Sequence, residues 1–284
     1  LNLRGNIIGD SLRESALFEY LKKTHKGCFL ATTGGSIVKV IHENNPFIDE
    51  FIELKELNIL SKKASKIKKA FFLFRAMLKA YRKMRGFDVC VLTQRHRYPY
   101  KLLPLIAGLK IIEKNSLPFT KYPCRMYFNK DEENAVKKYL GKNEKKRIAV
   151  DIESNDTSRC WSTHNFSMLI GLLLKRKYSV YLLGIDRQQN SPIIEKFGKK
   201  IQDIVGKTPI RESASLLKKM DFYVGNDSGL SHVAAAVDTS SLTILIDSVV
   251  DIFNDPKKSR AIKLRKPSVN EAFKAIDNEL QNKK

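Results

Sequence analysis

The fold is decided by the stretch Asp221-Phe-Tyr-Val-Gly-Asn-Asp-Ser-Gly-Leu-Ser-His-Val-Ala-Ala-Ala-Val237. Its apolar residues 222–224 predict a buried strand, and its small residues 230–237 predict a helix. The turn between them consists of residue types that begin helices and let backbone approach a ligand closely. A helix that starts at the carboxyl end of a parallel strand presents N–H groups to an anion. The stretch therefore predicts a pocket for a phosphate and a sugar.

The rest of the chain alternates short apolar runs with helical patterns. In the N-terminal half, a helical pattern at 12–21 precedes apolar or β-branched runs at 28–31, 37–41 and 47–52. In the C-terminal half, strands are predicted at 147–152, 179–183 and 242–246, and helices at 131–140, 166–174 and 211–220. A capping box at Ser268–Glu271 begins the last helix. This alternation predicts an α/β protein with doubly wound parallel sheets.

With 284 residues, the chain is long enough for two domains that each have a core. The polar stretch Gly141–Lys146 is the expected linker. The prediction is therefore an N-terminal domain of residues 1–145 and a C-terminal domain of residues 146–284. The last helix either completes the second domain or packs back on the first.

The net charge of +22 comes from 52 Lys and Arg against 30 Asp and Glu. Nucleic acid, anionic lipid headgroups and phosphorylated glycans are partners that fit this charge, and a lysine-rich solvated surface also explains it. Residues 61–85 form a basic helical segment that contains Phe71–Phe74. This segment is either a surface helix packed on the sheet or a surface that faces a membrane or an anionic acceptor.

A second basic cluster follows the apolar run 87–92. Arg95, His96 and Arg97 lie where the carboxyl end of a strand is predicted, so they form either an acceptor-anion site or ordinary loop charge. No apolar run reaches the ~18 residues that a membrane span needs. The four cysteines show no metal-binding spacing, which favours a reduced cytoplasmic protein without structural zinc.

Four blocks, in order along the chain, resemble glycosyltransferase family 9, the bacterial heptosyltransferases of lipopolysaccharide inner-core synthesis. They are Ile8-Gly9-Asp10, Phe87-Asp88-Val89 with Ala107-Gly108, Arg159-Cys160-Trp161, and Gly206-Lys207-Thr208 followed by residues 225–232. The resemblance implies two Rossmann-like domains facing across a cleft, the GT-B arrangement. It also implies a sugar-nucleotide donor on the C-terminal domain, a lipid-linked acceptor on the N-terminal domain, and inverting transfer without a metal or another cofactor.

Inverting transfer needs a base for the acceptor hydroxyl and positive charge for the leaving diphosphate. Asp10, in a loop at the end of a predicted strand, is the candidate base, and it also suits the N-cap of a helix over residues 11–23. Arg159 is the candidate cation, because its planar fork fits phosphate oxygens; the alternative is a surface arginine beside a core Trp161.

The remaining donor-site candidates follow predicted strands. The N–H groups of Ser228, Gly229 and Leu230 are expected to bind phosphate. Asp227 is repelled by phosphate, so it is expected to bind sugar hydroxyls or to cap the helix. His232 either reaches a phosphate or satisfies a core hydrogen bond. Three further residues are expected to line the nucleotide: Lys207, Thr208 and, for the ribose hydroxyls, Asp186.

The sequence departs from the family pattern at two places. The segment between Asp10 and Arg159 is short for the family, and Asp247-Ser-Val-Val-Asp251 replaces an expected Gly-x-Thr-x-Pro-like turn. Both departures leave the sugar and the acceptor open.

The leading hypothesis is a Gram-negative bacterial enzyme that transfers heptose from ADP-heptose to a phosphorylated Kdo-lipid A acceptor. Such an enzyme is cytoplasmic and peripheral on the anionic inner face of the inner membrane. The alternatives are another nucleotide sugar or a protein acceptor on the same fold, a basic nucleic-acid-binding protein, and a non-catalytic family member. No nucleic-acid motif is recognisable, so no nucleic-acid partner is expected.

Overall fold

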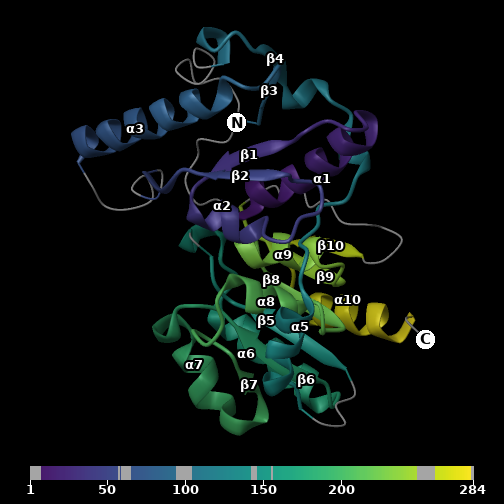
Figure 1. Cartoon of the computed structure of the whole chain (residues 1–284). Helices are drawn as coiled ribbons and strands as arrows, with labels where there is room; N and C mark the ends of the chain where they lie inside the picture. The colour runs from purple at the N-terminus through teal and green to yellow at the C-terminus, as the bar shows by residue number, and fades with distance from the viewer. Residues whose placement is uncertain are drawn as a thin grey trace. The chain divides into compact units, whose positions relative to one another are not determined.

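The computed structural model describes residues 8–56, 58, 65–93, 104–141, 146–154, 156–247 and 260–282. The chain divides into two compact units, Leu1–Pro123 and Cys124–Lys284 (Figure 1). Within the described ranges, no helix is both long enough and apolar enough to cross a membrane.

The N-terminal unit contains two short parallel strand pairs with helices between the strands. β1 (Ala31–Gly34) pairs with β2 (Glu50–Glu53), and β3 (Val89–Leu92) pairs with β4 (Lys110–Glu113). The helices are α1 (Ile8–Thr24), α2 (Ser36–Ile41) and α3 (Lys66–Met84), with 3₁₀ turns at Lys114–Ser116 and Phe119–Lys121. β2 follows α2, and the chain is helical at residues 104–106 before β4, as in the parallel βαβ connections that the alternation predicts.

The β-branched run 37–41 is a helix and not a strand. Val38 and Ile41 of α2 are buried, three residues apart on one helical face, and α2 packs on α1. Two buried contacts at helical spacing outweigh the weak β preference of these side chains. The apolar run 28–31 only leads into β1, and β2 forms at the end of the predicted segment 47–52.

The C-terminal unit is built on one parallel sheet of six strands in the order β10-β9-β8-β5-β6-β7. The strands are β5 (Arg147–Asp151), β6 (Ser179–Leu183), β7 (Gln202–Asp203), β8 (Phe222–Asn226), β9 (Ser241–Leu245) and β10 (Ala261–Arg265). The helices are α5 (Lys130–Ala135), α6 (Thr163–Lys175), α7 (Arg187–Phe197), α8 (Ile210–Leu217), α9 (Gly229–Ala236) and α10 (Val269–Asn282), and 3₁₀ turns lie at Val136–Tyr139, Thr157–Arg159 and Gly198–Lys200. This is the doubly wound sheet that the sequence predicts.

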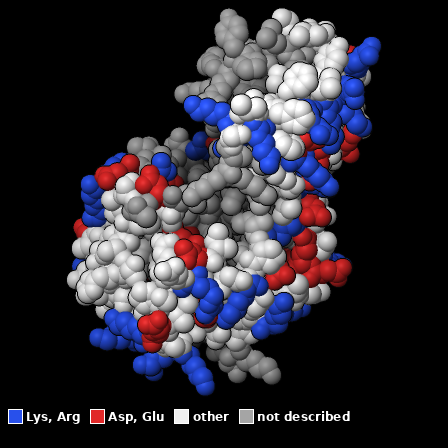
Figure 2. Space-filling model, turned by 90° about the vertical axis from the view of Figure 1, so that its left-hand side faces the viewer, with Lys and Arg blue, Asp and Glu red and all other residues white. Residues whose placement is uncertain are grey.

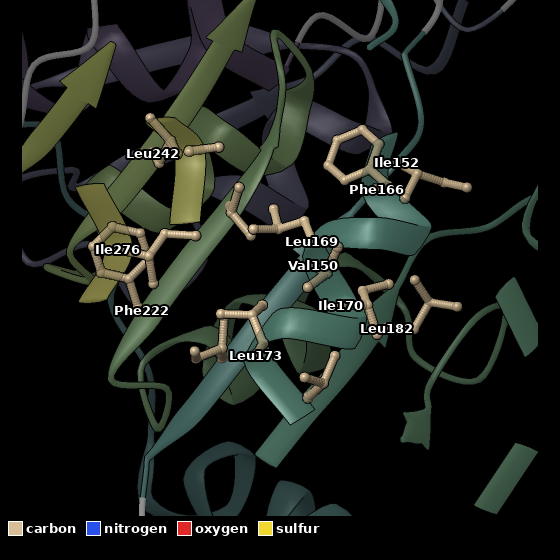
Figure 3. Packing of buried hydrophobic residues seen from close by; sticks show 14 of the residues in the cluster. Val150, Ile152, Phe166, Leu169, Ile170, Leu173, Leu182, Phe222, Leu242 and Ile276 are labelled. Atoms are coloured by element: carbon tan, nitrogen blue, oxygen red, sulfur yellow. The ribbon is translucent and has the colours of Figure 1, made fainter. Parts of the chain in front are cut away.

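One hydrophobic cluster of this unit lies between the sheet and helices α6 and α10. Phe166, Leu169, Ile170 and Leu173 recur at helical spacing along α6 and are fully buried against strand residues such as Val150 (Figure 3). Ile276 of α10 joins the same cluster. The capping box that predicts the start of α10 is present, since Ser268 Oγ accepts from Glu271 N at 3.3 Å and Ser268 N donates to Glu271 Oε2 at 2.8 Å.

The boundary between the two units differs from the one predicted from the sequence. The units divide after Pro123 and not after residue 145, because α5 packs on α8 of the C-terminal unit: Ser215 Oγ donates to Glu132 O at 3.1 Å, and Val136 is buried. The last helix does not need the N-terminal unit to cover its apolar face. Ala272, Ile276 and Leu280 of α10 are buried in the core of their own unit.

Candidate active site

The candidate site lies at the carboxyl ends of β5 and β8. From β5 the chain adds β6 and β7 on one side, and then returns to add β8, β9 and β10 on the other. The two neighbours β5 and β8 therefore flank a topological switch point, where the following loops leave in opposite directions and open a crevice. The segment after β5 carries Arg159, and the turn after β8 carries Asp227 and Ser228.

Buried Asn226 holds these two segments together. At the end of β8, its Oδ1 accepts from Trp161 N at 2.8 Å and its Nδ2 donates to Ile152 O at 2.8 Å. One side chain thus fixes both ends of the loop 152–161. Ser154 Oγ adds a third connection by donating to Asp227 O at 3.2 Å.

Arg159 and Asp227 form an ion pair across the switch point. Arg159 Nη1 lies 3.6 Å from Asp227 Oδ2, and Arg159 Nε lies 3.4 Å from Asp156 Oδ2. The side chain of Asp227 is only 11% exposed, whereas that of Arg159 is 46% exposed. The Arg159 guanidinium therefore remains accessible to a ligand, and the less exposed Asp227 carboxylate orients it. Trp161 is buried as predicted, with its indole N–H donating to Pro267 O at 3.1 Å.

Ser228 immediately precedes α9, and its side chain is turned towards the sheet. Ser228 Oγ donates to Asp151 Oδ2 at 2.7 Å and makes no side-chain cap bond to α9. The same Asp151 oxygen accepts from Tyr223 OH at 3.2 Å. Burial raises the pKa of Asp151 to about 7. A side chain at Gly225 would clash with Tyr223 and the Asp151 carbonyl, so glycine is required for this arrangement.

A second group of predicted residues lies at the ends of β6 and β7. Glu153 Oε1 accepts from the backbone N–H groups of Ile185 and Asp186 at 2.8 and 2.9 Å, and from Asn190 Nδ2 at 2.6 Å. Gly184 has φ +150°, and a side chain there would clash with Glu153. Asp186 is the N-cap of α7, since its Oδ1 accepts from Gln188 N and Gln189 N. Glu153 thus fixes the turn that presents Asp186.

Lys207 and Thr208 follow a left-handed glycine, Gly206, whose N–H donates to Gly184 O at 2.9 Å. This bond places them beside the turn that carries Asp186. Lys207 Nζ donates to Asp203 O at 2.6 Å, and Thr208 Oγ1 lies 2.8 Å from Ser213 Oγ. The structure thus gathers the donor-site candidates into two groups along one edge of a single sheet. Gly229 is the first residue of α9, and His232 lies in its first turn, half-buried.

The candidate residues of the N-terminal unit are Asp10 and the cluster at 95–97. Asp10 lies in the first turn of α1, which begins at Ile8, so it is neither in a loop nor the N-cap of a helix over 11–23. A carboxylate in this position is favoured by the helix dipole. Arg95, His96 and Arg97 lie outside the described residues.

Three site residues were missed by the sequence analysis: Asn226, Asp151 and Glu153. Asn226 stands inside the quoted motif, but its bonds run to a segment more than sixty positions away in the sequence. Asp151 and Glu153 end a predicted strand, and polar residues at that point are the signal that could have identified them.

The doubly wound sheet and the residues gathered at its switch point are those of an α/β protein of the GT-B glycosyltransferase type. A family model described as glycosyltransferase family 9 (heptosyltransferase) matches residues 68–276. Since this match covers most of the chain, the chain belongs to glycosyltransferase family 9. The family resemblance noted in the sequence is confirmed.

Two curated relatives are similar to parts of the chain. Lipopolysaccharide heptosyltransferase 3 of Escherichia coli (strain K12) is 29% identical over 102 residues, 34% of this chain and 30% of the relative. Lipooligosaccharide heptosyltransferase 2 of Haemophilus influenzae is 29% identical over 84 residues, 28% of this chain and 24% of the relative. The chain thus matches less than a third of the length of each relative.

Similarity to solved structures extends over nearly the whole chain. A family 9 glycosyltransferase from Veillonella parvula DSM 2008 has a TM-score of 0.79 and 13% identity, covering 97% of this chain and 95% of that one. The E. coli ADP-heptose lipopolysaccharide heptosyltransferase II has a TM-score of 0.73 and 16% identity, covering 98% and 97%. These likenesses confirm the predicted fold.

Proposed function

We propose that the protein is an inverting glycosyltransferase that binds a nucleotide sugar on its C-terminal unit. The observation that carries the proposal is the Arg159–Asp227 pair at the switch point beside the start of α9. A leaving diphosphate gains charge as its bond to the sugar breaks. A half-exposed guanidinium and the N–H groups at the start of a helix stabilise that charge more in the transition state than in the ground state.

The groups around this pair have complementary roles in the proposal. Because the Ser228 hydroxyl donates to Asp151, it does not compete for the N–H groups of Gly229 and Leu230. Asp227 holds Arg159 and has a second carboxylate oxygen for a sugar hydroxyl. His232, one turn into α9, contacts a phosphate. Asp186, Lys207 and Thr208, in the second group, line the nucleoside.

Asp10 is the proposed general base. The acceptor hydroxyl attacks the anomeric carbon while the bond to the diphosphate breaks on the opposite face, and the hydroxyl proton passes to the Asp10 carboxylate. Arg95, His96 and Arg97 are the proposed contacts to acceptor phosphates.

The proposed donor is ADP-heptose and the proposed acceptor a phosphorylated Kdo-lipid A core. Two findings support this donor and this acceptor. The chain belongs to glycosyltransferase family 9, and its two curated relatives are named as a lipopolysaccharide and a lipooligosaccharide heptosyltransferase. A related E. coli heptosyltransferase was solved with ADP. The proposed location is the cytoplasmic face of the inner membrane of a Gram-negative bacterium, where a lipid-linked acceptor and a soluble donor meet.

The proposal is tested by thermal-shift measurements with ADP, UDP and GDP, followed by mass analysis of the product from ADP-heptose and lipid A precursors. ADP is expected to raise the melting temperature selectively. Asp10→Asn is expected to keep this shift and to lose transfer by a factor of about 10² or more, as removal of a general base does.

Arg159→Met is expected to lose both the ADP shift and transfer, and Arg159→Lys to recover only part, since the ammonium lacks the planar fork. A shift with UDP alone would exclude ADP-heptose as donor. Unchanged turnover in Asp10→Asn would remove Asp10 from the mechanism.

A further inference from the structure

We propose that the solvent-facing side of α3 binds an anionic lipid bilayer and is the surface that brings the enzyme to its acceptor. The biological role of this surface rests on the proposed function, but the surface itself is formed by residues of α3 alone. α3 is thus the part of the chain that makes the membrane contact.

The surface contains a row of exposed apolar side chains. Ile67, Phe71, Phe74 and Leu78 are 84%, 55%, 64% and 40% exposed. Their spacing of four, three and four residues places them on one face of the helix. We call these four residues the apolar stripe.

The apolar stripe does not pack in the core of the N-terminal unit, because a second apolar face of α3 packs there. Ala76, Ala80 and Met84 are buried in the core of the N-terminal unit, and Leu73 and Met77 pack against the same cluster. A surface helix of a globular protein needs one apolar face. A second one, open to solvent, is typical of helices that lie in the interfacial layer of a membrane.

Positive charge runs along the stripe. The helix contains no Asp or Glu and seven basic residues: Lys66, Lys68, Lys69, Arg75, Lys79, Arg82 and Lys83. Lys68, Arg75 and Arg82 are exposed and spaced by seven residues, which aligns them along one border of the stripe. In Figure 2, lysine and arginine side chains gather around uncharged ones where α3 reaches the surface.

This combination favours a bilayer over other occupants. A second copy of the chain packed stripe to stripe would bring two rows of arginine and lysine together without a carboxylate on either helix. A nucleic acid would satisfy the charges but would leave Ile67 and Leu78 in water. An anionic bilayer satisfies both, because headgroups pair with the cations while apolar side chains enter the acyl boundary.

The test is co-sedimentation of the whole protein with vesicles of phosphatidylcholine, with and without phosphatidylglycerol, in the absence of donor and acceptor. The wild-type protein is expected to bind the anionic vesicles and to dissociate as salt is raised. Phe71→Ser/Phe74→Ser and Arg75→Gln/Arg82→Gln are each expected to lower the partition coefficient about tenfold or more.

Matched controls lie on the other unit. Met168→Ser removes an apolar side chain that is 49% exposed on α6, and Lys199→Gln/Lys200→Gln removes two exposed charges. Both are expected to bind vesicles as the wild type does. The melting temperature of each variant, with and without ADP, shows whether its fold and donor site are intact.

Equal vesicle binding by the wild type and both α3 variants would overturn the proposal. Absence of vesicle binding by the wild type would also overturn it. A concentration-dependent dimer that only the α3 variants lose would do the same, because the partner of the stripe would then be a second copy of the chain. None of these results bears on the ADP shift, so failure of the membrane surface and failure of the proposed function are distinguishable.

Discussion

At the scale of single residues, Asn226 fixes the loop that follows β5 at the candidate donor site. Its amide bonds to Trp161 N and Ile152 O fix the segment that carries Arg159. A carboxylate or an aliphatic side chain at this position cannot replace an amide, which donates and accepts at the same time. The loop would then lose one of its two fixed ends.

Asn226→Ala is therefore expected to weaken ADP binding at least tenfold and to lower the free energy of unfolding by about 2–4 kcal/mol, because two buried backbone groups lose their partners. Urea unfolding followed by Trp161 fluorescence measures the stability, and calorimetry measures ADP affinity. Thr239→Ala is the control, since it removes a buried hydrogen bond to Leu217 O in the same unit. If both variants bind ADP normally, Asn226 does not organise the site.

At the scale of elements, the short helix α5 belongs to the C-terminal unit because α8 holds it. The guanidinium of Arg211, only 9% exposed, donates to both carboxylate oxygens of Glu132 and to Tyr127 O at 2.7 Å. It also lies 5.2 Å from the ring centroid of Phe128. These contacts move the boundary between the units to residue 123.

Arg211→Met is expected to destabilise the C-terminal unit by about 3 kcal/mol, because it leaves a carboxylate without its bidentate partner. Lys218→Met, which breaks a more exposed pair with Glu133, is expected to change stability by less than about 1 kcal/mol. Chemical denaturation checks both values. Equal effects would mean that the position of α5 does not depend on Arg211.

At the scale of the whole molecule, burial shifts the pKa of a titratable side chain in each unit, and the two shifts are expected to affect stability in opposite ways. Burial lowers the pKa of His42 in the N-terminal unit to about 3. As pH falls below 6.5, the unfolded unit binds a proton that the folded unit does not, so the folded state loses stability. Burial raises the pKa of Asp151 in the C-terminal unit to about 7. As pH falls below 7, the folded unit binds that proton first, so the folded state gains stability.

Acidification from pH 7.5 to pH 5 is thus expected to destabilise the N-terminal unit and to stabilise the C-terminal unit, each by about 2 kcal/mol. Hydrogen exchange, corrected for intrinsic rates, should show protection falling in α1 and α2 and rising in β5 and β8. Trp161 fluorescence reports the C-terminal unit separately. His42→Gln and Asp151→Asn should each abolish the response of their own unit. A response of the same sign in both units would contradict the assignment.

The sequence by itself determined the alternation of strands and helices, the doubly wound class and the family, because strand and helix periodicity and the turn chemistry after Val224 are local properties. The capping box of α10 is equally local. Tertiary structure decided what depends on distant contacts. Packing on α1 turned the β-branched run of α2 into a helix, Arg211 set the unit boundary, and the sheet order brought Arg159 to Asp227. Asn226, Asp151 and Glu153 acquire their roles only from that order, because parallel neighbours in a doubly wound sheet lie far apart in the chain.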